Sequence, residues 1–130
     1  MYRYAIENLD KWKNSKNRKP LIIEGARQVG KTWIMKEFGK KSYNKTVYIN
    51  FDSNVQMAEL FSIDLNVERI IMGLELYAGH KINPADTLII FDEVQEVPKA
   101  LSSLNVWKYL KYGAKASSVD VISVISPSRK

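Results

Sequence analysis

The sequence predicts an α/β fold with a parallel sheet of three to four strands flanked by helices. Short apolar runs of the kind found in buried parallel strands alternate with segments of helical periodicity. This alternation is typical of parallel strands joined by crossover helices. A chain of 130 residues can bury one hydrophobic core, so we expect a single domain over residues 1–130.

The two periodicities locate the expected elements in order. Helices are predicted over residues 2–15, 31–40, 55–61 and 66–78, and from 98 to 109 or 110. Strands are predicted over residues 21–23, 46–52, 87–93 and 119–125. The second helix is expected to close near Gly39, and Gly79 is expected to stop the fourth. Leu9 and Trp12 are expected to be packing residues.

Composition excludes several kinds of site. The chain has no cysteine, which excludes disulfides and thiolate chemistry, and its single histidine, His80, argues against a histidine metal cluster. No stretch resembles a signal peptide or a membrane span, so we expect a cytoplasmic protein with no membrane partner.

The charge is unevenly distributed along the chain. Residues 1–45 carry twelve Lys/Arg against four Asp/Glu, whereas residues 46–130 carry eight against ten. The basic half favours anionic partners, although a solvated basic helix and loop would explain the same charge.

A phosphate-binding motif follows the first predicted strand. Residues 25–32, GARQVGKT, fit the Walker A pattern G-x-x-x-x-G-K-[ST] between a strand run and a helical run. Glycines at both ends let the backbone turn its N–H groups toward phosphate, and the helix start adds its own. Lys31 would reach the β- and γ-phosphates, and the Thr32 hydroxyl could ligate Mg²⁺. The alternative is a glycine turn with a solvated lysine. The expected nucleotide-binding residues are Gly25, Ala26, Arg27, Gln28, Val29, Gly30, Lys31, Thr32 and Trp33.

Two acids end the third predicted strand. Asp92 and Glu93 directly follow the apolar run 88–91. Ligands of open α/β sheets bind at the carboxyl ends of the strands, so Asp92 should approach the loop of Lys31 if the first and third strands are parallel in one sheet. Asp92 would then hold Mg²⁺, directly or through water, and Glu93 would orient or deprotonate the attacking water. Acids are common after strands, and it is the pairing with the loop that favours this Walker B-type role.

Three segments resemble a known family. Residues 2–32, 47–52 and 89–104 are similar to the N-terminal part of prokaryotic AAA-type P-loop ATPases. The resemblance implies a three-layer P-loop NTPase sandwich that binds ATP and Mg²⁺, with Asp92 supporting the metal and with Glu93 and Lys31 as the catalytic residues. It includes Gln95 without giving it a role, and the preference for ATP over GTP rests on it alone. Because such proteins usually carry a further C-terminal region, it also implies a missing C-terminal domain or a protein partner.

Residues 105–130 depart from the family pattern. The family would continue with a helix and then a strand that lies between the first and third strands and ends in a polar sensor residue. Either residues 119–125 form this fourth strand, with Ser123 or Ser126 near the sensor position, or the chain is truncated and this divergent tail is poorly packed. No motif places Arg69 or Arg129, the only arginines after the loop, as an arginine finger.

Three functions therefore remain open. The first is an ATP-hydrolysing enzyme, because the Asp-Glu pair favours water activation over the nucleotide kinase that the loop alone would permit. The second is a nucleotide-binding module without useful catalysis. The third is a nucleic-acid-binding protein that uses the basic stretch Lys11, Lys13, Lys16, Arg18 and Lys19.

Overall fold

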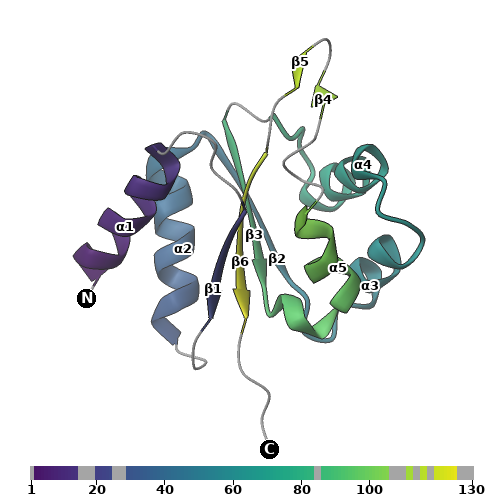
Figure 1. Cartoon of the computed structure of the whole chain (residues 1–130), viewed down its shortest axis with the longest axis horizontal. Helices are drawn as coiled ribbons and strands as arrows, with labels where there is room; N and C mark the ends of the chain where they lie inside the picture. The colour runs from purple at the N-terminus through teal and green to yellow at the C-terminus, as the bar shows by residue number, and fades with distance from the viewer. Residues whose placement is uncertain are drawn as a thin grey trace, which may run out of the picture.

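Parallel strands at the centre of the molecule carry helices on both faces (Figure 1). The structure is a computed structural model that describes residues 2–14, 20–24, 29–83, 86–105, 111–112, 115–116 and 119–125. Within these residues the central sheet consists of β1 (Leu21–Glu24), β6 (Asp120–Ile125), β3 (Thr87–Asp92) and β2 (Lys45–Asn50), in this spatial order and all parallel. The predicted fold class is confirmed.

The helices divide between the two faces of the sheet (Figure 1). Helices α1 (Tyr2–Asn14) and α2 (Val29–Ser42) cover one face, and α3 (Val55–Ser62), α4 (Val67–Ala78) and α5 (Pro98–Ser102) cover the other. The 3₁₀ turns η1 (Val94–Glu96) and η2 (Ser103–Asn105) flank α5. Within the described ranges, no helix has the length and apolar character needed to cross a bilayer.

Strand β6 lies in the middle of the sheet. It pairs with β1 from Leu21↔Ile122 onward and with β3 from Leu88↔Asp120 onward. The interpretation of residues 119–125 as a central fourth strand is therefore confirmed. The strand is buried because both of its neighbours satisfy its backbone groups while its apolar side chains face the helices on either side.

Each face of the sheet has its own hydrophobic cluster. Toward α1 and α2, the side chains of Leu9, Phe38 and Ile90 pack together, with Trp12 against them, as expected for Leu9 and Trp12. Toward α3 to α5, three phenylalanines pack together in the core. The rings of Phe51, Phe61 and Phe91 meet edge to face, with centroids 5.2–5.8 Å apart.

Helix α2 extends slightly beyond the predicted close near Gly39. The helix continues to Ser42, and a Cβ at Gly39 would collide with the side chain of Thr46. The glycine is therefore needed for the close approach of α2 to β2 and not for a helix stop. By contrast Gly79 does end α4, with a φ of 81° and an N–H that donates to the Glu75 carbonyl at 2.8 Å.

The helix predicted from residue 98 to 109 or 110 is shorter than expected. Helix α5 ends at Ser102, and the Ser103 hydroxyl donates to the Ala100 carbonyl at 2.5 Å, a bond that competes with regular helix continuation. After η2, residues 106–110 lie outside the described residues. The following antiparallel pair β4 (Lys111–Tyr112) and β5 (Lys115–Ala116) was not expected from the sequence.

Arg69 has a structural role in the described chain. Its guanidinium donates to the Asp64 carboxylate at 2.9 Å and to the carbonyl of Leu60 at 2.7 Å. These bonds tie the start of α4 to the end of α3. The hydrogen bond from the backbone N–H of Asn66 and, after it, the Arg69 guanidinium hold the pKa of Asp64 below its usual value. The guanidinium thus links two helices, while Arg129 lies outside the described residues.

Candidate functional site

The carboxyl end of the sheet carries Thr32, Asp92 and Glu93, three of the residues singled out in the sequence. Helix α2 begins at this end, close to where β1 and β6 finish (Figure 1). Strand β3 ends here with Asp92, whose register partners are Asn50 in β2 and Val124 in β6. The parallel arrangement thus brings the first turn of α2 and the end of β3 to one edge, as the rule for open α/β sheets predicts.

Asp92 contacts the first turn of α2. The Thr32 hydroxyl donates a hydrogen bond to Asp92 Oδ2 at 2.8 Å, although the two residues are sixty positions apart in the chain. Side chains at alternate positions of a strand share a face, so Asp92 lies on the same side as Leu88 and Ile90, which pack in the cluster against α2. This alternation aims the carboxylate at the helix start.

Tyr48 from the neighbouring strand β2 also donates to Asp92 Oδ2, at 2.5 Å. Burial raises the pKa of Tyr48 well above its usual value, and the hydrogen bond to the Asp92 carboxylate and the charge of this group raise it further. The phenol therefore stays protonated and remains a donor. The ammonium of Lys36 lies over the Tyr48 ring, 4.0 Å from the ring centroid.

Glu93 follows Asp92 in an uncommon backbone conformation. Its φ of 55° and ψ of 40° place it in the left-handed region, which a non-glycine residue adopts at a cost of about 1–3 kcal/mol. Its side chain is buried, and its Oε2 accepts a hydrogen bond from the Gln95 amide at 2.7 Å. The backbone turn takes the second acid out of the strand, and Gln95 fixes the position of its carboxylate.

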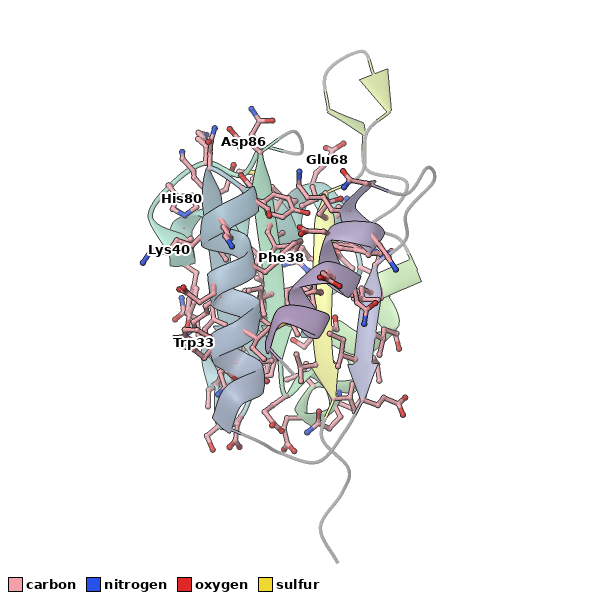
Figure 2. The ribbon with its side chains drawn as sticks, turned by 90° about the vertical axis from the view of Figure 1, so that its left-hand side faces the viewer. Trp33, Phe38, Lys40, Glu68, His80 and Asp86 are labelled. Atoms are coloured by element: carbon pink, nitrogen blue, oxygen red, sulfur yellow. The ribbon has the colours of Figure 1, made fainter. Side chains whose placement is uncertain are left out.

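Several of the predicted site residues cannot be placed. Residues 25–28 lie outside the described residues. The backbone of Val29, Gly30 and Lys31 belongs to the start of α2, but the side chains of Val29 and Lys31 lie outside what the structure describes. Trp33 is described, and 54% of its surface is exposed. Figure 2 shows Trp33 and Phe38 on the same helix, with Phe38 fully buried in the core.

Ser123 lies in the interior of β6. Its register partner in β3 is Phe91, so its side chain faces the α3 to α5 side, opposite to Asp92. The residue is fully buried, and among the described residues its hydroxyl has no hydrogen-bond partner. Ser126, the alternative sensor position, lies outside the described residues. A sensor role for either serine stays a prediction.

Strands β1, β2 and β3 and the two acids after β3 fall within one family match. The AAA domain family matches residues 17–119. The chain belongs to the AAA domain family. The match extends from before β1 to the residue that precedes β6, and it confirms the resemblance to AAA-type ATPases. Membership indicates that this AAA domain binds nucleotide, with ATP as the family's nucleotide.

Tyr48 is the site residue that sequence reasoning missed. In the sequence, residues 46–52 read only as a strand rich in β-branched and aromatic residues. The available signal was positional, because Tyr48 precedes the strand end by two residues and so shares a face with Asn50, the register partner of Asp92. Using it requires knowing that β2 and β3 are neighbours and in which register they pair.

Proposed function

We propose that this AAA domain hydrolyses ATP in a Mg²⁺-dependent reaction at the carboxyl end of its sheet. The observation that carries the proposal is the 2.8 Å hydrogen bond between Thr32 and Asp92. A hydroxyl at a helix start and a carboxylate at a strand end are the two groups that P-loop NTPases use around their metal. Their contact supports one shared site, with residues 25–31 as the phosphate cradle.

The donor set suits Mg²⁺. The metal prefers oxygen ligands and is usually bound through one or two carboxylates together with substrate phosphates and water. Among the residues that the structure describes, there is no group of three or more His, Cys, Asp and Glu side chains that could hold a metal ion. We propose that Thr32 and Asp92 hold Mg²⁺ together with the nucleotide. The bound metal would neutralise charge on the β- and γ-phosphate oxygens.

Glu93 is the proposed group that orients and deprotonates the attacking water. It comes directly after Asp92, and its carboxylate is buried and accepts from Gln95. A held carboxylate beside the metal-supporting acid can take the proton as the water attacks the γ-phosphate. Lys31 is proposed to reach the β- and γ-phosphates and to stabilise the charge that develops on them.

The first test measures ATP binding with and without Mg²⁺ by calorimetry, together with phosphate release. We expect Lys31→Ala to weaken Mg-ATP binding about 10- to 100-fold, because a hydrogen bond to a charged group contributes roughly 1.5–3 kcal/mol. Lys40→Ala, at an exposed position of the same helix, is the matched control and should bind as the parent does. A parent that binds no ATP would contradict the proposal, and binding without phosphate release would identify a nucleotide-binding module instead.

Gln95 gives a second test of the same site. Gln95→Leu keeps the size of the side chain but removes the amide that donates to Glu93. We expect phosphate release to slow about tenfold with ATP affinity unchanged, because a misplaced general base loses much of its effect. Gln56→Leu, an exposed glutamine on α3, should leave both quantities unchanged. Equal rates for the parent and Gln95→Leu would show that the Glu93–Gln95 bond does not matter for hydrolysis.

A further inference from the structure

We infer that Tyr48 is a positioning residue for the metal site and sets how strongly Mg²⁺ promotes nucleotide binding. The inference rests on the proposed function, because it assigns the Tyr48 hydroxyl a task in the site of Thr32 and Asp92. The task is to hold the Asp92 carboxylate in the orientation that keeps Thr32 directed at the metal.

The argument begins at Asp92 Oδ2. This oxygen accepts from the Thr32 hydroxyl at 2.8 Å and from the Tyr48 hydroxyl at 2.5 Å. A threonine hydroxyl has one hydrogen, so its donation to Asp92 leaves the oxygen lone pairs of Thr32 for a cation. The direction of these lone pairs therefore depends on where Oδ2 lies, and Tyr48 holds that oxygen from the side of β2.

Tyr48 is itself held in place. Its backbone is paired with Ile90 in the β2–β3 ladder. Its side chain is half-buried against the hydrophobic cluster between the sheet and helices α1 and α2. The Lys36 ammonium over its ring adds a contact from α2. A donor fixed by strand and helix can orient a carboxylate, whereas a mobile surface group could not. Partners that hydrogen-bond a metal-supporting carboxylate commonly change metal affinity or activity by about 10- to 100-fold when removed.

The chain contains a matched pair at the other end of the same sheet. The Tyr43 hydroxyl donates to Asp120 Oδ2 at 2.7 Å, Asp120 is buried at the start of β6, and the Lys13 ammonium lies 5.0 Å from the Tyr43 ring centroid. Loss of either hydroxyl thus removes a hydrogen bond from a tyrosine to a buried aspartate, under a lysine in each case. Of these two tyrosines, Tyr48 is the one at the end of the sheet where Thr32 contacts Asp92.

The experiment measures ATP affinity by calorimetry in excess Mg²⁺ and in EDTA for the parent, Tyr48→Phe and Tyr43→Phe. We expect the Mg²⁺-dependent gain in affinity to fall roughly tenfold or more in Tyr48→Phe, with the affinity in EDTA unchanged. Tyr43→Phe should keep the full gain. Melting temperatures should fall by similar amounts in the two variants, which separates positioning from general stability.

The contrary results are distinct. If the parent gains affinity from Mg²⁺ and Tyr48→Phe gains as much, the Tyr48 inference is overturned while the proposed function stands. If both variants lose the gain equally, Tyr48 acts only through stability and the inference is again overturned. If the parent binds no ATP, the proposed function itself fails and the inference fails with it. Circular dichroism checks that each variant is folded before binding is measured.

Discussion

Replacing Glu93 by glutamine is expected to slow phosphate release by about 10²- to 10⁴-fold while Mg-ATP still binds with the parent's affinity. Glutamine has nearly the shape of glutamate but cannot accept the proton of the attacking water. The effect should appear in single-turnover phosphate release and not in calorimetric binding, because Glu93 is proposed to act on water and not on the nucleotide. The side chain of Glu93 is buried directly after β3, and a glutamine amide of nearly the same size should occupy the same space.

A matched acid is available for comparison. Glu96 lies three residues later in η1, and its side chain is exposed. Glu96→Gln removes the same charge from the same segment and should leave the rate unchanged. If both variants hydrolyse ATP as fast as the parent, Glu93 is not the general base. If Glu93→Gln loses binding as well, the residue supports the nucleotide instead of the water.

Replacing Asp92 by asparagine is expected to remove most of the Mg²⁺-dependent gain in ATP affinity and to slow phosphate release about 100-fold or more. The amide oxygen can still accept from Thr32 and Tyr48, so the geometry of the site is kept while its negative charge is lost. ATP affinity in EDTA should not fall, because the variant removes a negative charge near the phosphates. The melting temperature should not fall either, because a neutral amide is less costly to bury than a carboxylate.

Asp120→Asn is the matched control for that experiment. Asp120 is also a buried carboxylate that accepts from a tyrosine hydroxyl, but it lies at the opposite end of the sheet. Its replacement should leave the Mg²⁺ dependence of ATP binding intact. If both variants lose the Mg²⁺-dependent gain in ATP affinity equally, the effect comes from the stability of the sheet. If Asp92→Asn keeps the full gain, Asp92 does not belong to the metal site.

Most of the framework could be predicted from the sequence because its strands are continuous apolar runs. The apolar run before Asp92 predicts a buried strand, and the observed β3 ends within one residue of the predicted strand. Gly79 was predicted correctly as a stop because its left-handed φ is a local property of the chain. Both features depend on residues that are close in sequence.

The predictions that failed or were missing depend on distant contacts. Gly39 has the same local appearance as a helix stop, and only the nearness of Thr46 in the next strand gives the reason for the glycine. The bond from Tyr48 to Asp92 joins residues 44 positions apart and exists because β2 lies beside β3 in one particular register. Periodicity identifies each strand but does not give the register between strands.

The position of β6 has a consequence for how the domain forms during synthesis. Among the described strands β1 pairs only with β6, and Leu21 meets Ile122 across about 100 residues of chain. A nascent chain that has reached Leu104 already contains every residue proposed to touch ATP or its metal, yet β1 still has no partner. At roughly 5–20 residues per second the ribosome needs further seconds to supply β6. Strand β1 is therefore fixed in the sheet only when β6 enters between β1 and β3.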